Sequence, residues 1–179
     1  MVGAPSATSQ RVFFALWPDP PARSRLGELS RVVVEDSGGR GIAENLLHLT
    51  LAFLGEQSAD RVAALKRVAA SIEASGFLLA LDELGAFRRE GIAWLGASAL
   101  PAELVALHRQ LSEALQAEGF ATDRRAYAPH LTLARRVTRA QSRRLAEPVR
   151  WRVASFALVE SEISRQGPRY RTVGEWPLA

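Results

Sequence analysis

The segment His48-Leu49-Thr50-Leu51-Ala52 decides the fold, because the same five letters return as residues 130–134 of this 179-residue chain. An internal duplication is the natural explanation of such a repeat. Leucine and alanine matches are common in a chain rich in both, whereas the repeat uses two of the only three histidines. We therefore expect two related halves, each with one copy of the segment.

Both copies lie in stretches that favour strands, residues 45–55 and 129–135. Side chains alternate between the two faces of a strand, so His48 and Thr50 share one face and the neighbouring leucines share the other. The same alternation places His130 and Thr132 on one face. The leucines supply the core, and two related halves could bring the two His-x-Thr pairs opposite each other in a cleft.

The repeated pairs suggest proton-transfer chemistry on a phosphate. Histidine titrates near neutrality, so two facing imidazoles can act as base and acid in one step. The threonine hydroxyls beside them are donors that suit a tetrahedral anion. The alternative is zinc, which requires three or four ligands with a carboxylate or thiolate among them. The repeat has no acidic residue and the chain no cysteine, so we expect no metal; His108 is interpreted as an ordinary helix-surface or boundary residue.

The rest of the chain predicts an α+β fold. Strands are expected at residues 11–17, 45–55, 77–84, 92–96, 129–135, 151–163 and 170–176. Helices are expected at 20–34 (capped by Asp19), after Ser58, from Pro101 to Gly119, and briefly at 138–141, where Thr-Arg-Ala-Gln matches a capping box. Because several strands are neighbours in sequence, antiparallel sheets fit better than a doubly wound parallel sheet. Residues 1–10 are interpreted as a loose polar leader and residues 11–179 as a single domain.

Composition narrows the partners. No apolar run reaches the ~18 residues that a membrane helix needs, and the lack of cysteine excludes disulfides and agrees with a cytoplasmic location. The formal net charge is +4. Residues 1–119 carry 11 basic and 14 acidic groups, whereas residues 120–179 carry 12 basic and 5 acidic groups. This asymmetry favours a polyanionic partner, with a merely solvated basic face as the alternative.

Four stretches together resemble the two-histidine (2H) phosphoesterase superfamily, which is named for two His-x-Ser/Thr motifs. They are RVFFALW (11–17), NLLHLTLAFLGE (45–56), PHLTLAR (129–135) and the closing GPRY (167–170) with WPL (176–178). Within the superfamily the pattern is most similar to the bacterial RNA 2′,3′-cyclic phosphodiesterases, also called LigT-like or ThpR-like.

The resemblance implies a bilobal fold: two pseudo-symmetric lobes with antiparallel sheets and flanking helices around a central groove. It implies hydrolysis of RNA 2′,3′-cyclic phosphate ends to 2′-phosphomonoesters, without metal or cofactor. By this resemblance His130 activates water, His48 protonates the departing 3′ oxygen, and Thr50 and Thr132 hold phosphate oxygens. The expected partner is RNA with such a terminus, with no membrane, and the expected oligomeric state is a monomer.

Two further residues match the family in the position five beyond each histidine. Arg135 matches an arginine that contacts the substrate phosphate. Strict alternation would place Arg135 on the leucine face and Arg136 on the histidine face, so the strand must end or bulge near Ala134. Phe53 resembles an aromatic residue that stacks on the terminal base. A core position on the leucine face is the alternative for Phe53.

Two other functions remain open. Ligation to a 2′–5′ linkage would use the same site, with a 5′-hydroxyl in place of water. An RNA-binding module without catalysis would use only the basic C-terminal half. Tyr127, just before the second motif, is a weaker candidate for the groove wall.

Overall fold

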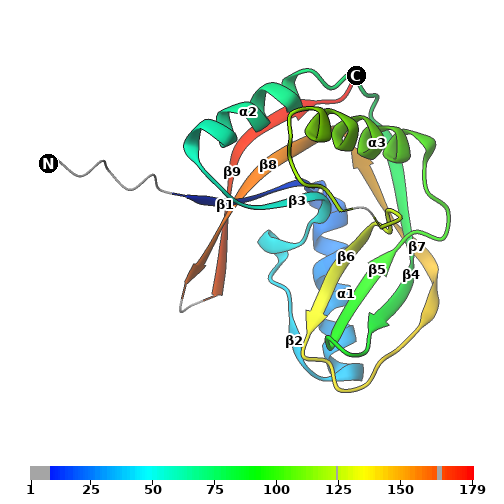
Figure 1. The fold of residues 1–179 in the computed structure, drawn as a ribbon. Coiled ribbons are helices and arrows are strands. Elements are labelled where there is room, and N and C mark those ends of the chain that lie inside the picture. The colour runs from blue at the N-terminus through cyan, green and yellow to red at the C-terminus, as the bar shows by residue number, and fades with distance from the viewer. Residues whose placement is uncertain (1–8, 124, 165–166) are drawn as a thin grey trace, which may run out of the picture.

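The computed structural model describes residues 9–123, 125–164 and 167–179. In these residues the strands form one antiparallel sheet with the order β7-β4-β5-β6-β3-β1-β8-β9, and β2 pairs with β6 (Figure 1). The strands are β1 (Gln10–Leu16), β2 (Arg40–Gly41), β3 (Leu49–Gln57), β4 (Phe77–Phe87), β5 (Ile92–Gly96), β6 (His130–Arg135), β7 (Arg143–Val153), β8 (Ser155–Ser164) and β9 (Gly167–Pro177). The predicted α+β arrangement with antiparallel strands is confirmed.

The sheet consists of two equivalent halves that meet between β6 and β3. One lobe contains β6, β5, β4 and β7, and the other contains β3, β1, β8 and β9 in the matching order. Between the two halves of the sheet, the strand ladder consists of one pair of residues, Leu49 with Leu131. These are the second letters of the two repeated segments, so the pseudo-twofold axis passes between them. The predicted bilobal, pseudo-symmetric fold is confirmed.

The helices are exchanged between the lobes. The helices are α1 (Pro20–Ser37), α2 (Ala59–Ala70) and α3 (Ala102–Ala117), with a short 3-10 helix, η1 (Glu44–Leu46). Although α1 follows β1, it packs on β6 and β7 of the other lobe; α3 follows β5 and packs on α2 and β3. In Figure 1, α2 and α3 lie together at the top, over the lobe that contains β3, β8 and β9, and α1 lies beside β6.

The predicted caps begin two of these helices. The Asp19 carboxylate accepts a hydrogen bond from the Ala22 amide at 2.9 Å, and the Ser58 hydroxyl accepts one from the Arg61 amide at 3.4 Å. Such caps satisfy amides that have no partner inside the helix. Both caps were expected from the sequence and are confirmed.

The leucine face of the repeat lies in the core, as predicted. The repeat leucines are buried and belong to one continuous cluster with the inward-facing leucines of α3: Leu49, Leu51, Leu131, Leu133, Leu104, Leu107, Leu111 and Leu115. Burying one such side chain stabilises the fold by roughly 1.5–3 kcal/mol. This core fixes which face of each repeated strand is left for the groove.

The helix expected at residues 138–141 is absent, and that prediction is wrong. The amides of Thr138 and Arg139 both donate to the carbonyl of Ser37, at 3.0 and 3.2 Å. The Thr138 hydroxyl donates to the same carbonyl at 3.2 Å, so it does not cap a helix of its own. The end of α1 thus holds these donors, and the chain continues into β7.

The single strand expected at residues 151–163 is two strands. β7 ends at Val153 and pairs with β4, while β8 begins at Ser155 and pairs with β1 in the other lobe. Ala154 is therefore the crossing between lobes, and its carbonyl accepts a hydrogen bond from the Leu178 amide at 2.8 Å.

The predicted leader, residues 1–10, includes Gln10, which is the first residue of β1; residues 1–8 lie outside the described residues. Among the helices of the described chain, none is both long and apolar enough to cross a membrane.

Candidate active site in the groove

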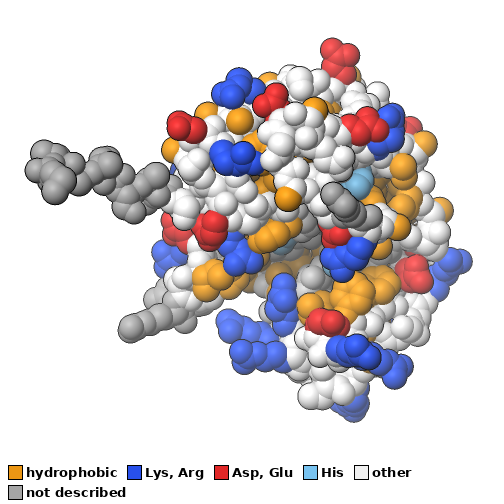
Figure 2. Space-filling model, in the orientation of Figure 1, with side chains coloured by type: hydrophobic (Ala, Val, Ile, Leu, Met, Phe, Trp, Pro, Cys, Tyr) orange, Lys and Arg blue, Asp and Glu red, His pale blue; other side chains and the backbone are white. Residues whose placement is uncertain are grey.

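The polar face of the repeat opens into a cavity of about 460 Å³ between the lobes. All six residues singled out in the sequence line it: His48, Thr50, His130, Thr132, Arg135 and Phe53. Figure 2 shows a hollow across the middle of this face, with hydrophobic side chains on its walls and Lys and Arg side chains around it. A second cavity of about 380 Å³, between α1 and β7, is lined by Arg25, two glutamates and aliphatic residues and contains no histidine.

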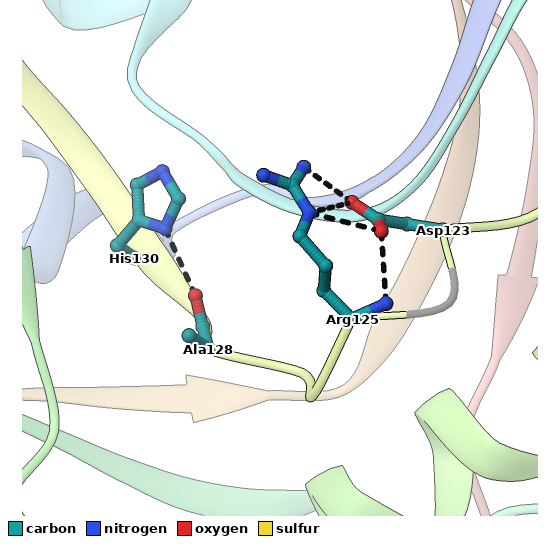
Figure 3. A network of polar contacts seen from close by, with 4 residues as sticks. All are labelled: Asp123, Arg125, Ala128 and His130. Atoms are coloured by element: carbon teal, nitrogen blue, oxygen red, sulfur yellow. Dashed lines mark hydrogen bonds and ion pairs between the residues drawn. The ribbon is translucent and has the colours of Figure 1, made fainter.

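The two imidazoles are held in the same way. Nδ1 of His48 lies 2.7 Å from the Leu46 carbonyl oxygen, and Nδ1 of His130 lies 2.9 Å from the Ala128 carbonyl oxygen (Figure 3). A carbonyl only accepts, so Nδ1 carries the proton in each ring. Nε2 is then the nitrogen left for a substrate, and in a neutral ring it is a proton acceptor.

Aromatic side chains surround His48. The ring centroids of Phe13, Trp17 and Tyr170 lie 4.9, 5.6 and 5.3 Å from the His48 centroid, and Tyr170 meets the imidazole edge-on at 88°. Burial lowers the pKa of His48; the hydrogen bond to the backbone carbonyl opposes this, and the nearby Arg135 cation lowers the pKa further. In the free protein this environment favours the neutral imidazole.

The aromatic contacts of His130 come from β4 and β5 of its own lobe. Phe87 meets the imidazole edge-on with centroids 5.1 Å apart, and Trp94 lies 6.3 Å away. Each histidine is thus wedged against rings from its own half of the sheet. This packing restricts the orientation of both imidazoles.

A β-bulge brings Arg135 to the groove. In the ladder between β6 and β5, Thr132 pairs with Trp94 and Ala134 pairs with Ala93, so Leu133 has no partner. The extra residue shifts the alternation by one, as bulges do. Leu133 and Ala134 are consequently both buried, and Arg135 is exposed on the cavity wall. Arg136 follows with a positive φ of 58° outside the strand.

The first repeated segment has a bulge at the equivalent leucine. Thr50 pairs with Ala15 and Ala52 pairs with Phe14, which leaves Leu51 without a partner. Phe53 therefore lies on the cavity wall with 53% of its surface exposed, so the core alternative is wrong.

Sequence reasoning missed part of the wall. Arg11 lines the cavity, and its guanidinium lies 5.0 Å from the centroid of the Phe53 ring, in a cation–π contact. Phe13 and Tyr170 were quoted only as letters of family motifs. Alternation in β1 was the available signal: residues 11 and 13 lie on the face opposite Val12 and Phe14, which are core residues.

Tyr127 does not line the cavity. Its ring stacks on His108 with centroids 3.6 Å apart, and its hydroxyl donates to the Thr50 carbonyl at 3.3 Å. Burial raises the pKa of Tyr127, so the hydroxyl stays protonated and remains a donor. His108 is half-buried on α3, as a boundary residue would be. The pair ties the segment before His130 to β3.

An ion pair lies in the same segment. The Asp123 carboxylate accepts hydrogen bonds from the Arg125 amide and Nε, both at 3.0 Å, and Figure 3 shows this pair beside His130. The Arg125 side chain lowers the pKa of Asp123 to about 2. Both side chains are largely exposed, so the pair orients the chain more than it stabilises the fold.

Metal ligands are not clustered in the described part of the chain. There, no group of three or more His, Cys, Asp or Glu residues could hold an ion.

Comparisons with known proteins agree on one family. Residues 17–164 match the model of the 2′-5′ RNA ligase superfamily. The RNA 2′,3′-cyclic phosphodiesterase of Escherichia coli (strain K12) is 35% identical, over 94% of this chain and 97% of that protein. The enzyme of the same name from Aeropyrum pernix is 30% identical, over 75% of this chain and 83% of its own length.

Solved structures agree as well. A crystal structure of a phosphoesterase matches with a TM-score of 0.88 at 32% identity, covering 96% of this chain and 99% of its own. E. coli LigT complexed with 3′-AMP matches with a TM-score of 0.87 at 32% identity and the same coverage. The chain therefore belongs to the 2′-5′ RNA ligase superfamily, the two-histidine phosphoesterases, and within it to the RNA 2′,3′-cyclic phosphodiesterases.

Proposed function

We propose that this protein hydrolyses RNA 2′,3′-cyclic phosphate ends to 2′-phosphomonoesters by paired-histidine catalysis. The observation that carries the proposal is the single cavity shared by both His-x-Thr pairs. Each pair contributes an imidazole whose Nδ1 is engaged by the backbone and whose Nε2 is free to exchange a proton. The name shared by the relatives supports the same reaction.

The reaction needs one proton removed and one delivered. His130 Nε2 takes a proton from water, whose oxygen forms a bond to phosphorus. The bond between phosphorus and the 3′ oxygen breaks, and His48 Nε2 donates its proton to that oxygen. The phosphate stays on the 2′ oxygen, and each positioned proton transfer contributes about 10²–10⁴-fold to the rate. This assignment of acid and base follows the family resemblance.

His48 must gain a proton before it can act as the acid. In the free protein, burial and the Arg135 cation lower the pKa of His48. A bound cyclic phosphate brings a negative charge beside Arg135, which offsets that cation and favours the imidazolium. Substrate binding thus promotes the protonation state that the acid requires.

The remaining residues bind rather than transfer protons. Thr50 and Thr132 offer hydroxyl donors at equivalent positions on the two walls, suited to two non-bridging phosphate oxygens. Arg135 supplies the positive charge. The exposed Phe53 ring offers a surface for the terminal base, a usual device for single-stranded RNA.

Ligation is the second candidate, because the matching family model is named for it. In ligation a 5′-hydroxyl would take the place of water at the same histidines: its oxygen bonds to phosphorus, the bond from phosphorus to the 3′ oxygen breaks, and the 3′ oxygen receives a proton. Water is far more concentrated, so hydrolysis dominates unless the groove also holds the second RNA end.

One incubation separates the alternatives: an oligonucleotide ending in a 2′,3′-cyclic phosphate, in EDTA. A new 2′-phosphate end is expected; a joined product would favour ligation, and unchanged RNA would favour a binding module. His48→Ala and His130→Ala should abolish most of the turnover. His108→Phe is the matched control: it removes the third imidazole, which lies outside the cavity, but keeps a ring against Tyr127, so turnover should stay unchanged.

A further inference from the structure

The far end of the β8–β9 hairpin stands free of the rest of the sheet. β8 pairs with β1 only from Ala157 to Glu160, so residues 161–164 pair with β9 alone. In Figure 1 this end extends past β1, away from the other strands.

One face of this free end belongs to the groove. Ser161 and Ile163 of β8 and Pro168 and Tyr170 of β9 line the same cavity as the two histidines. They form two cross-strand pairs, Ser161 with Tyr170 and Ile163 with Pro168, so they share one face of the hairpin. Ile163 is 74% exposed, the largest fraction among the exposed large hydrophobic residues of the described chain.

The hairpin is fixed in place rather than loosely attached. Arg171 Nε donates to the Glu160 carboxylate at 3.0 Å. These two residues form a cross-strand pair, and Glu160 is the last residue of β8 that pairs with β1. Glu160 is buried, which strengthens this charge-assisted bond. On the inner face, the Tyr170 ring packs on Phe13 with centroids 5.2 Å apart, and on His48. The exposed inner face therefore has a set position relative to the catalytic pair.

Positive charge continues from the phosphate site toward this face. Burial raises the pKa of Tyr170, whereas the Arg135 and Arg11 cations lower it, so both guanidiniums lie within electrostatic reach of one phenol. Arg11 forms no ion pair with any residue that the structure describes. Its charge is available to a second phosphate, beyond the one held by Arg135.

We propose that the inner face of the β8–β9 hairpin is a second nucleotide subsite, which binds the nucleotide preceding the cyclic-phosphate end. The proposal rests on the proposed function. With the terminal base on Phe53, the phosphate that joins the last two nucleotides lies near Arg11. The penultimate base then contacts Ile163 and Pro168, an apolar surface that tolerates any base. RNA ends of two or more nucleotides are thus the preferred substrates, over cyclic mononucleotides.

The test compares two substrates, adenosine 2′,3′-cyclic phosphate and the adenylyl dinucleotide with the same cyclic end. Wild-type kcat/KM should be about tenfold higher for the dinucleotide, within the range that one base contact supports. Ile163→Ser should remove most of that preference by raising KM for the dinucleotide. Turnover of the mononucleotide should stay within about twofold of the wild-type value. Leu78→Ser is the control: it likewise replaces an aliphatic side chain by serine, at a 56% exposed strand position outside the cavity, and the preference should persist.

A second variant tests the charge. Arg11→Gln should weaken the salt dependence of dinucleotide KM by about 0.7 units of log–log slope, because one phosphate contact to a single strand is lost. The subsite is overturned if wild-type shows no preference for the dinucleotide, or if Ile163→Ser leaves the preference intact. Failure of the proposed function looks different, because neither substrate would then be hydrolysed by the wild-type protein.

Discussion

Replacing Arg135 by Gln tests the bulge at Leu133 and the phosphate site together. Without the bulge, strict alternation would point Arg136 into the groove; with it, Arg135 lines the cavity. Gln keeps much of the side-chain length and removes the charge. Arg136→Gln is the matched control, since it makes the same change one residue further along, outside the strand.

The expected size of the loss follows from the lost contact. A hydrogen bond to a charged group contributes about 1.5–3 kcal/mol, or about 10–150-fold in rate. Arg135 is exposed, so solvent screens its charge and the lower part of that range applies. We expect kcat/KM to fall about 10–30-fold in Arg135→Gln and to change less than about twofold in Arg136→Gln.

The assay is steady-state hydrolysis of adenosine 2′,3′-cyclic phosphate, paired with an NMR titration of the imidazoles. The Arg135 cation is one cause of the lowered pKa of His48, so Arg135→Gln should raise that pKa, and Arg136→Gln should not. A larger rate loss in Arg136→Gln, or an unchanged His48 pKa in Arg135→Gln, would refute this account of the bulge.

Three other predictions follow from the site. The pKa values of His48 and His108 should lie below the usual ~6.5, because burial lowers both. As the pH falls, the unfolded chain therefore binds protons at these histidines before the folded chain does, and the free energy of unfolding should decrease below about pH 6.5. This decrease should be less steep in His48→Gln, which lacks one of the two groups. Turnover should survive exhaustive chelation, and activity lost in EDTA but restored by a divalent ion would contradict the two-histidine mechanism. His48→Ala and His130→Ala should each lower kcat at least ~100-fold, with the double variant little worse than either single one. A substrate whose 3′ oxygen is a better leaving group should restore turnover in His48→Ala and not in His130→Ala. Restored turnover in His130→Ala instead would mean that His130 is the acid and His48 the base.

The repeat predicted the architecture well because histidine is rare in this chain. Two histidines at equivalent positions of the repeat indicated two related lobes and one shared groove, and the alternation of side chains along a strand placed the leucines in the core. The segment at residues 138–141 was harder to foresee. The Ser37 carbonyl, about a hundred residues away in sequence, captures the donors of Thr138 and removes a helix that the local pattern favoured.

Two features of the site had no local signal. The bulges at Leu51 and Leu133 depend on how β3 and β6 align with β1 and β5. A buried leucine can occur at a bulge or at a paired position, so the residue type does not reveal which of the two it occupies. Likewise Ala154, where the chain crosses between lobes, has no Gly or Pro beside it, and buried side chains lie on both sides of it, at Val153 and Phe156. Register and crossing points arise from tertiary pairing, which periodicity does not encode.

The exchanged helices bear on the origin of the duplication. α1 packs on β6 and β7 of the opposite lobe and α3 packs on β3, so a half-length chain with one His-x-Thr segment would leave part of its sheet surface uncovered. Such a chain would bury that surface by pairing with a second copy and swapping helices, a low-cost route to a homodimer. Its twofold axis would coincide with the present Leu49–Leu131 contact and already set two identical histidines face to face. In the present chain the two walls differ at the matching position, with Phe53 on one and Arg135 on the other.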